Sequence, residues 1–219
     1  MNVTISPNEH AFHQAVAGSV PRERHGQTIL LRRRQALRPT RGQTDQCFRV
    51  QTGAMRVCRP LVDGRRQITA FLFPGDWIGL DEVYTLNTSF EAISCTEVER
   101  FSLHMQEDVA PSDLATGPAL RDMLRARLAA VQSRLLTLGH KNAREKLACF
   151  LLEMSERLAG GDDAFMLPMS RYDIADYLCL SSETVCRNFT QLMTSGIIAL
   201  PEPKRVHILR RGPLEFIGQ

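Results

Sequence analysis

The sequence predicts an α+β protein with three parts: a jelly-roll or barrel-like domain, a long helix, and a C-terminal winged helix-turn-helix domain. Short alternating strands between Thr28 and Phe101 predict the first part. A single apolar seam from Leu120 to Leu138 predicts the second, and two short capped helices within Met169–Asn188 predict the third. We therefore expect these segments: an arm over 1–27, a β domain over 28–110, a long helix over 111–139, and a C-terminal domain over 140–219 with its helix-turn-helix at 169–188.

The strands of the β domain follow from period-2 alternation between turn signals. Phe48 and Val50 alternate with polar neighbours and should face inward. Asp63-Gly64 is a strong hairpin signal, and Pro74-Gly75-Asp76 predicts the next turn. The expected strands are Thr28–Arg33, Cys47–Thr52, Ala54–Arg59, Ile68–Leu72, Ala92–Cys95 and Glu97–Ser102.

The long helix carries apolar residues at spacings of 4, 4, 3, 4 and 3, which places them on one face. Such a face packs either against a second helix or into the core of its own domain, and the spacing alone leaves both open. The residues of the seam are Leu120, Leu124, Leu128, Val131, Leu135 and Leu138.

The C-terminal domain should begin after a hinge at Gly139-His140-Lys141. The spacing predicts an amphipathic helix over Ala143–Leu158, then an exposed loop at Gly160–Asp163. After the helix-turn-helix, Ile197–Leu209 resembles the hairpin of a winged helix. The residues of the first helix expected to face inward are Leu147, Phe150, Leu151 and Met154.

The helix-turn-helix is predicted from its caps. Ser170 and Asp173 form a capping box that starts one helix. Ser181 is a favourable N-cap for a second helix that should end near Ser195, before Gly196. The residues expected to be buried are Ile174, Ala175 and Leu178 in the first helix and Val185, Phe189 and Leu192 in the second.

The outward face of the second helix presents Ser182, Glu183, Cys186, Arg187 and Gln191. A carboxylate can accept a hydrogen bond from cytosine N4, and an arginine can bind guanine O6 and N7 together. This face is therefore typical of a helix that enters the DNA major groove. Two amphipathic helices joined by a short loop, without any nucleic-acid role, would give the same apolar pattern.

The run Ser181–Arg187, Ser-Ser-Glu-Thr-Val-Cys-Arg, resembles the recognition helix of the Crp/Fnr transcription regulators. The β domain resembles the cyclic-nucleotide-binding-type β-roll of the same family at Gly53–Arg56, Asp63–Ile68, Phe71–Asp76 and Ile78–Leu80. The resemblance extends from about Thr28 to Arg211. It implies a homodimer paired through the long helix, double-stranded DNA and RNA polymerase as partners, and a TTG-N8-CAA-like palindrome as the binding site.

The resemblance also implies roles for individual residues. Arg187 would read a guanine, Glu183 a cytosine or support Arg187, and Ser182 and Cys186 would touch neighbouring bases. The residues expected to contact phosphates are Ser170, Ser181, Thr184, Lys204 and Arg205.

No cofactor is expected. Members that bind cyclic AMP pair its phosphate with an arginine, but no arginine occurs between Arg66 and Arg100 here. Members with an iron–sulfur cluster carry cysteines near the N-terminus, but the first cysteine here is Cys47. The remaining group is the FixK-like branch, which implies an activator of low-oxygen or nitrogen-fixation genes. The alternative is a regulator gated by an unidentified small molecule in the β-roll, or by haem bound to His10, His13, His25 or His104.

Cys186 is a candidate regulatory residue. It lies in the first turns of a helix and beside Arg187, and both features favour a thiolate. Oxidation would add bulk and negative charge to the DNA-facing surface, which predicts a redox brake. Alternatively, the thiol simply contacts a thymine methyl group.

Composition adds weak information about partners. The net charge is +3, and residues 141–219 contain ten Lys/Arg and ten Asp/Glu, so any DNA affinity depends on arrangement. Four cations lie between Lys204 and Arg211, a segment that either follows phosphates or is a solvated basic end. The six cysteines lack the spacing of a zinc site or a disulfide framework.

The class of protein is restricted further by what the sequence lacks. No apolar run is long enough to span a membrane, and Met1–Val20 does not resemble a signal peptide, so we expect a cytoplasmic protein. The sequence contains no H-E-x-x-H, P-loop or G-x-S-x-G motif, so we do not expect an enzyme. A β-roll module whose helical end binds another protein remains a competing interpretation.

Overall fold

The computed structural model describes residues 27–37, 46–78, 88–102, 132, 134–135 and 137–219. The chain divides into two compact units, one built from the N-terminal strands and one that includes Arg134–Gln219. Each unit has its own core. Residues 1–26 of the expected arm over 1–27 and most of the long helix lie outside the described residues, and Gln27 belongs to the first strand.

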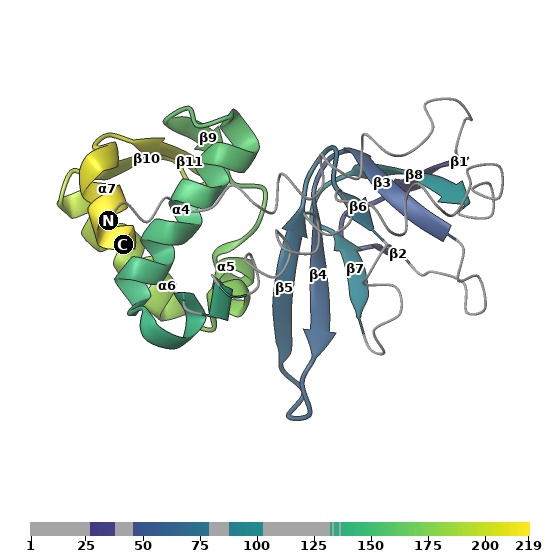
Figure 1. Cartoon of the computed structure of the whole chain (residues 1–219), viewed down its shortest axis with the longest axis horizontal. Helices are drawn as coiled ribbons and strands as arrows, with labels where there is room; N and C mark the ends of the chain where they lie inside the picture. The colour runs from purple at the N-terminus through teal and green to yellow at the C-terminus, as the bar shows by residue number, and fades with distance from the viewer. Residues whose placement is uncertain (1–26, 38–45, 79–87, 103–131, 133, 136) are drawn as a thin grey trace, which may run out of the picture. The chain divides into compact units, whose positions relative to one another are not determined.

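The N-terminal unit contains two four-stranded sheets, ordered β1-β8-β3-β6 and β2-β7-β4-β5 (Figure 1). Every strand pair whose register is resolved in these sheets is antiparallel. The strands are β1 Gln27–Leu31, β2 Ala36–Leu37, β3 Gln46–Thr52, β4 Met55–Pro60, β5 Arg66–Leu72, β6 Trp77–Ile78, β7 Ser89–Ala92 and β8 Thr96–Ser102.

The core of this unit is formed by side chains from both sheets. Phe48 and Val50 of β3 are buried with Val98 of β8, as the alternation predicted, and they share one cluster with Met55 and Phe90 of the other sheet. Apolar burial of this kind stabilises the folded state by roughly 25 cal/mol per Å². The jelly-roll prediction is confirmed.

The turn that joins β3 to β4 requires glycine. Gly53 has φ 84°, and a Cβ at this position would lie 2.3 Å from the carbonyl oxygen of Cys95. One prediction is wrong in the segment that faces Gly53. A strand was expected at Ala92–Cys95, but the strand here ends at Ala92, and Ile93–Cys95 forms a bend. The bend is stabilised because Ser94 Oγ accepts a hydrogen bond from the Ala54 amide at 3.0 Å.

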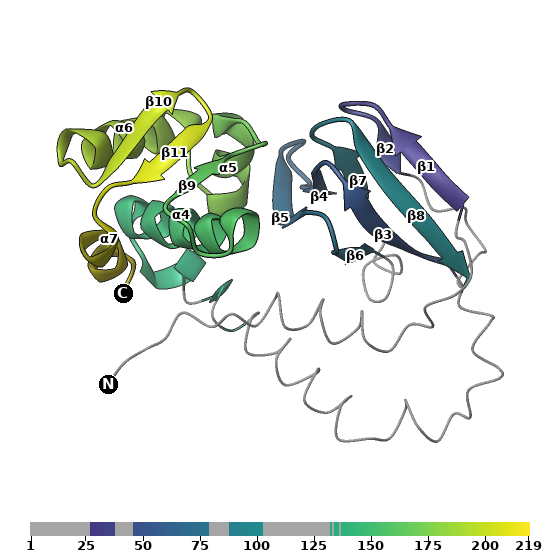
Figure 2. The same cartoon turned by 90° about the horizontal axis from the view of Figure 1, so that it is seen from above.

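From Ala143 onward, the described residues of the C-terminal unit form four helices and a three-stranded sheet ordered β10-β11-β9. The sheet packs on helices, since β9 contacts α4 and β10 contacts α6 (Figure 2). The elements are α4 Ala143–Ala159, β9 Ala164–Met166, α5 Arg171–Leu178, α6 Ser182–Thr194, β10 Ile198–Glu202, β11 Arg205–Ile208 and α7 Arg211–Gly218.

Helix α4 agrees closely with its prediction. Asn142 caps it by accepting from the amides of Arg144 and Glu145, and Gly160 ends it in the left-handed conformation. The four residues predicted to face inward are all buried: Leu147, Phe150, Leu151 and Met154. The Gly160–Asp163 loop is largely exposed, as expected.

Two elements of this unit were not predicted. Strand β9 adds a third strand to the expected hairpin by pairing with β11, and α7 closes the chain against α4. Arg211 anchors α7 through hydrogen bonds to Ser155 Oγ (3.1 Å) and the Gly161 carbonyl (2.9 Å). No helix in the described part of the chain is long and apolar enough to cross a membrane.

Candidate nucleic-acid interface

Helix α5 starts at the predicted capping box. Ser170 Oγ accepts from the Asp173 amide (3.2 Å), and Asp173 Oδ2 accepts from the Ser170 amide (2.9 Å). The Ser170 hydroxyl also donates to Asp173 Oδ2 at 2.7 Å. Ser170 was predicted to contact a phosphate. It is half-buried, and its hydroxyl is already hydrogen-bonded to Asp173 in the first turn of α5.

The turn between the two helices is made by Cys179. This residue adopts the left-handed conformation (φ 55°) and caps α5, after which the Leu180 amide donates to the Ala175 carbonyl at 3.0 Å. Non-glycine residues adopt this conformation only uncommonly, so no residue pattern predicts it here. After this turn Ser181 caps the second helix, and α6 begins at Ser182.

Helix α6 is fixed at its start by Ser181, whose Oγ accepts from the Thr184 amide at 3.1 Å. The hydroxyls of Ser181 and Thr184 are also in contact, at 2.8 Å. The predicted inward residues of both helices are buried: Ile174, Ala175, Leu178, Val185, Phe189 and Leu192. The helix-turn-helix prediction is thereby confirmed as a structural element.

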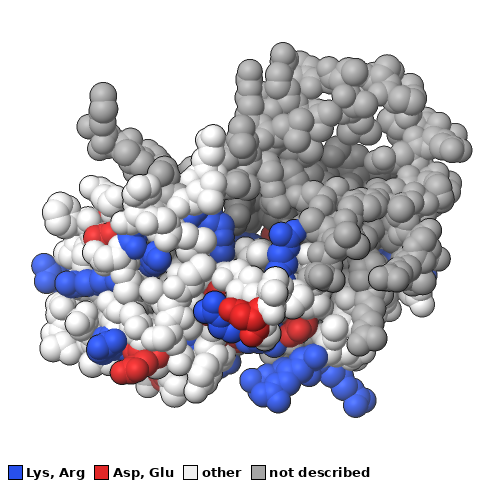
Figure 3. Space-filling view, turned by 90° about the horizontal axis from the view of Figure 1, so that it is seen from below, with Lys and Arg blue, Asp and Glu red and all other residues white. Residues whose placement is uncertain are grey.

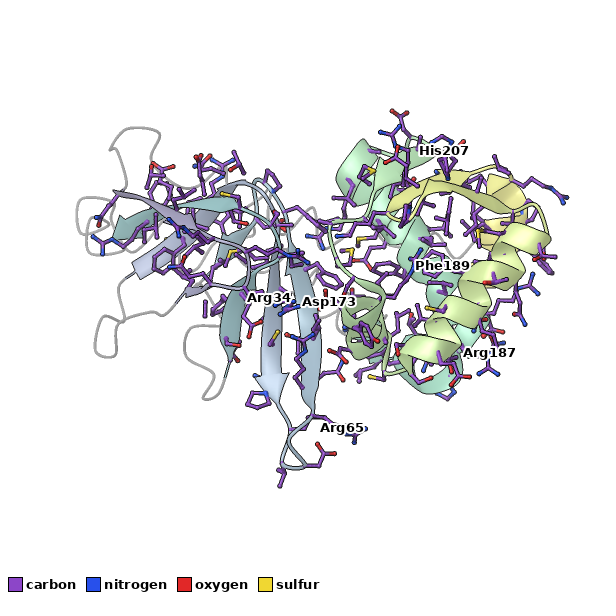
Figure 4. All side chains as sticks on the ribbon, turned by 180° about the vertical axis from the view of Figure 1, so that it is seen from behind. Arg34, Arg65, Asp173, Arg187, Phe189 and His207 are labelled. Atoms are coloured by element: carbon purple, nitrogen blue, oxygen red, sulfur yellow. The ribbon has the colours of Figure 1, made fainter. Side chains whose placement is uncertain are left out.

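The outward face of α6 is where the sequence placed it. Glu183, Cys186 and Arg187 are exposed, and Ser182 is half-buried. Figure 4 shows Arg187 pointing away from the helix, whereas Phe189 lies on its inner side. A carboxylate, a thiol and a guanidinium thus share one accessible surface that begins at a helix N-terminus.

The same face continues beyond the predicted residues. Thr190 and Thr194 are exposed, but each hydroxyl donates to the carbonyl four residues earlier: to Cys186 at 3.1 Å and to Thr190 at 2.9 Å. Their spacing from Arg187 could have identified them. Gln191 is exposed, as expected.

Arg171 is a site residue that the sequence did not reveal. Its guanidinium carbon lies 3.3 Å from the centre of the Phe189 ring, and Nη2 donates to the Pro203 carbonyl at 3.4 Å. Burial lowers the pKa of Arg171 to about 10, and the nearby Cys186 opposes this shift. The guanidinium therefore stays charged at neutral pH.

The cations of the Lys204–Arg211 segment point in different directions. Lys204 Nζ donates to the Pro168 carbonyl at 2.8 Å, and the exposed Arg205 lies 3.6 Å from Glu202. Arg211 instead contacts the carboxylates of Glu156 (2.6 Å), Asp163 (3.2 Å) and Glu215 (3.2 Å). The charge of Arg211 is thus balanced by carboxylates, which limits the basic surface of this segment to Lys204, Arg205 and Arg210.

Charge is mixed on the face of the molecule that Figure 3 shows. Figure 3 shows Lys and Arg side chains interspersed with Asp and Glu side chains on one face. This agrees with the balanced composition of residues 141–219. Any recognition of DNA by this unit therefore depends on individual side chains more than on a broad positive field.

The remaining predicted site residues belong to the long helix. Among the seam residues only Leu135 and Leu138 are described; both are helical, and Leu135 is 66% exposed in the single chain. The other four lie outside the described residues. All six cysteines are described and are free thiols, with Cys95, Cys179 and Cys186 exposed.

Comparison with known proteins agrees with this geometry. Residues 145–217 match the Crp-like helix-turn-helix domain, and residues 32–107 match the cyclic nucleotide-binding domain. The chain is 39% identical over 166 residues to the nitrogen fixation regulation protein FixK of Rhizobium meliloti, covering 76% of this chain and 75% of that protein.

Solved structures give the same result. FixK2 from Bradyrhizobium japonicum superposes with a TM-score of 0.76 at 34% identity, covering 89% of this chain and 98% of that chain. A CooA mutant from Carboxydothermus hydrogenoformans shares the fold, with a TM-score of 0.70 at 17% identity over 89% of this chain and 88% of that chain. The curated relatives are named as regulators and not as enzymes. The chain belongs to the Crp/Fnr family of DNA-binding transcription regulators, in its FixK-like branch.

Proposed function

We propose that the chain acts as a homodimeric activator that binds a TTG-N8-CAA-like palindrome and recruits RNA polymerase. The observation that carries the proposal is the exposed face of α6, where Glu183 and Arg187 stand one helical turn apart behind the Ser181 cap. Arg187 reads the guanine of the TTG arm, and Glu183 accepts from a cytosine or orients Arg187. Ser182 and Cys186 touch the neighbouring bases.

The spacing of the two arms of the palindrome agrees with recognition by a dimer. The centres of the two arms are about 11 base pairs apart, close to one turn of DNA, which is the spacing that a twofold pair of recognition helices reads. The apolar seam of the long helix supplies the contact between protomers, and the exposed Leu135 side chain is in keeping with this role. Ser181, Thr184, Lys204 and Arg205 surround the base-reading residues as phosphate contacts.

The regulator works without a cyclic nucleotide, an iron–sulfur cluster or another cofactor. Cyclic-AMP-binding members carry an arginine for the phosphate within the segment that corresponds to Thr88–Ala92 here. The charged group of this segment is the carboxylate of Glu91, which accepts from Arg56 Nε (3.0 Å) and Nη2 (2.7 Å). These residues do not fit an anionic phosphate.

Oxidation of Cys186 lowers DNA affinity in this proposal. The exposed thiol reacts with a peroxide to give a sulfenic acid and water, and further oxidation adds negative charge beside the DNA phosphates. In gel-shift titrations, peroxide should weaken binding by wild type and leave Cys186→Ser unaffected. Equal weakening of both proteins would refute the brake and leave the thymine-methyl contact as the role of the thiol.

The target genes are those of nitrogen fixation, because the relatives named FixK carry that role in their names, or those of low-oxygen metabolism, as the family resemblance implies. The central experiment selects binding sites from random DNA with the purified full chain, reduced and oxidised. Enrichment of TTG and CAA arms at one-turn spacing is the expected result. Enrichment of a single arm would contradict the dimer, and the absence of any salt-dependent DNA binding would favour a protein-binding module.

Gating by a small molecule is the second candidate function, and it predicts a different behaviour. The β-roll of the family hosts effectors, and an effector that binds the folded state raises its melting temperature. If DNA affinity of the pure reduced protein is already high, an effector is not required.

A further inference from the structure

A lysine and a cysteine meet where α7 docks on the start of α4, away from the residues assigned to DNA. Lys141 lies immediately before the α4 cap, and Cys149 lies in the second turn of that helix. Lys141 Nζ is 3.2 Å from Cys149 Sγ. Both groups also hydrogen-bond the Gly218 carbonyl at the end of α7: Cys149 Sγ donates to it at 3.1 Å, and Lys141 Nζ donates to it as well.

Packing holds this cluster together and leaves it open to small oxidants. Gly218 is buried, and a Cβ there would lie 3.6 Å from Cys149 Sγ and 3.4 Å from Leu152 Cδ1. These are van der Waals distances, so the end of α7 packs directly against the thiol. Lys141 and Cys149 are each half-buried, in contrast to the fully buried Cys47 and Cys58.

The chemistry of this pair follows from its contacts. Peroxides oxidise an accessible cysteine sulfur to a sulfenic acid, and the sulfur of Cys149 is only partly covered. The sulfenic acid that forms on Cys149 would lie within contact distance of the lysine nitrogen, since Nζ and Sγ already touch. An amine in this position can be joined to the sulfur through the oxygen that the sulfur has gained.

We propose that Lys141 and Cys149 form an oxidation-dependent crosslink in which one oxygen atom bridges the lysine nitrogen and the cysteine sulfur. A first peroxide converts the thiol to the sulfenic acid and releases water. The Lys141 ammonium then releases a proton to solvent. A second peroxide accepts two electrons as the N–O bond forms: the amine loses one hydrogen, the sulfenic acid loses the other, and both leave with the peroxide oxygens as two waters. The bridged nitrogen keeps one N–H, which still donates to the Gly218 carbonyl.

The crosslink would fix the junction that precedes α4. It joins the residue before the Asn142 cap to the second turn of the same helix, so the chain cannot fray at this end. It is chemically separate from Cys186, because the two thiols lie on different helices with different partners. The proposal does not depend on DNA binding, and it is tested without DNA.

Mass spectrometry of the full chain tests the crosslink. After mild peroxide treatment, the gain of one oxygen and loss of two hydrogens should raise the mass of the Cys186→Ser protein by about 14 Da, compared with about 16 Da for a sulfenic acid. Trypsin should then fail to cut after Lys141, and a peptide of residues 135–144 should appear joined to residues 147–157. A thiol reductant should restore the separate peptides.

Three variants in the same background decide the outcome. Lys141→Arg keeps the cation beside Cys149 but lacks the amine, and Cys149→Ser lacks the sulfur, so neither should form the joined peptide. Lys146→Arg changes a lysine of the same helix and should still form it, with the melting temperature of each variant confirming that it is folded. A joined peptide in Lys141→Arg, or oxidation of Cys149 in the parent Cys186→Ser protein without any joined peptide, would overturn the proposal.

Discussion

The guanidinium of Arg171 lies over the ring of Phe189, with its central carbon 3.3 Å from the ring centre. The same guanidinium donates to the Pro203 carbonyl at 3.4 Å. One side chain at the start of α5 therefore connects the inner face of α6 with the turn between β10 and β11. The orientation of the exposed face of α6 depends in part on this contact.

Replacing Arg171 by Met should weaken both folding and DNA binding. The lost cation–π contact is worth about 0.5–2 kcal/mol, and α6 loses a support behind Arg187. Arg171→Lys is the matched control, because it keeps the charge but not the planar stack, and it should rescue only part of the loss. Urea unfolding and gel-shift titration of the three proteins measure the two effects. Wild-type values for Arg171→Met in both assays would contradict the supporting role.

The pKa of Arg171 also predicts how the effect depends on pH. Burial lowers this pKa to about 10, below the ordinary value, so the folded state binds its proton less tightly than the unfolded state. The contribution of Arg171 to the unfolding free energy is therefore constant below pH 10 and becomes more favourable only above it. Between about pH 6 and 9, the difference in unfolding free energy between wild type and Arg171→Met, measured by urea unfolding, should not change.

Two substitutions at Ser181 should separate its structural role from its contact with DNA. Ser181→Ala removes the cap of α6 and should lower the unfolding free energy by about 1 kcal/mol. Ser181→Asp keeps an acceptor for the Thr184 amide, so stability should be retained, but a carboxylate beside a phosphate should weaken DNA binding. Thermal unfolding and salt-dependent gel shifts distinguish the two. If Ser181→Asp binds DNA like wild type, Ser181 does not contact a phosphate.

Arg211 should be required for the attachment of α7. Its side chain is 28% exposed and contacts three carboxylates, and it donates to the fully buried Ser155 hydroxyl. Arg211→Ala should destabilise this unit by about 1–3 kcal/mol. Arg211→Lys should restore little, because one ammonium cannot reproduce a fork with several partners. Hydrogen exchange of α7 measures the effect, and unchanged protection in Arg211→Ala would refute the anchoring role.

These contacts explain which parts of the fold could be predicted. The caps at Ser170 and Ser181 and the hairpin at Asp63-Gly64 are local signals, because the atoms that interact lie within a few residues. Strand β9 was missed because its pairing partner, β11, lies about forty residues later in the chain. Helix α7 was missed because Gly212 and Pro213 oppose helix formation, and only its tertiary contacts stabilise it.

The features of the candidate site also fall into two groups: local ones that the sequence could predict, and ones that depend on tertiary contacts. Exposure of Glu183, Cys186 and Arg187 follows from helical periodicity, so the sequence could predict it. The Arg171–Phe189 contact joins two helices, and the left-handed Cys179 depends on how they pack, so neither has a periodic signature. The expected strand at Ala92–Cys95 failed because residues 93–95 bend around Gly53, a nonlocal contact.

Burial of Cys47 predicts an alkaline limit to stability. Desolvation raises its pKa from 9.0 to about 11, opposed by a backbone hydrogen bond, so the folded state retains the thiol proton more tightly than the unfolded state. The stability that this group contributes is complete below pH 9 and is lost as the pH rises toward 11, on the order of 2 kcal/mol. In urea unfolding, Cys47→Ala should reduce the decline of the unfolding free energy with rising pH. Removal of the exposed Cys95 is the control and should leave the decline unchanged. An identical alkaline slope in wild type and Cys47→Ala would contradict the prediction.

Replacing Arg187 by Ala and replacing Arg205 by Ala should change different properties of DNA binding. Arg187 projects from the exposed face of α6 that we propose reads the bases, so Arg187→Ala should cost about 1–3 kcal/mol on the TTG-N8-CAA site and should relax the preference for the guanine. Arg205 is exposed beside Glu202 at the wing, so Arg205→Ala should weaken all sequences alike and reduce the salt slope by about one. Titrations against the palindrome and against a variant with the guanine replaced, each at several salt concentrations, measure both properties. If Arg187→Ala weakens the two DNAs equally, Arg187 contacts a phosphate, and the guanine is read by another residue of the same face.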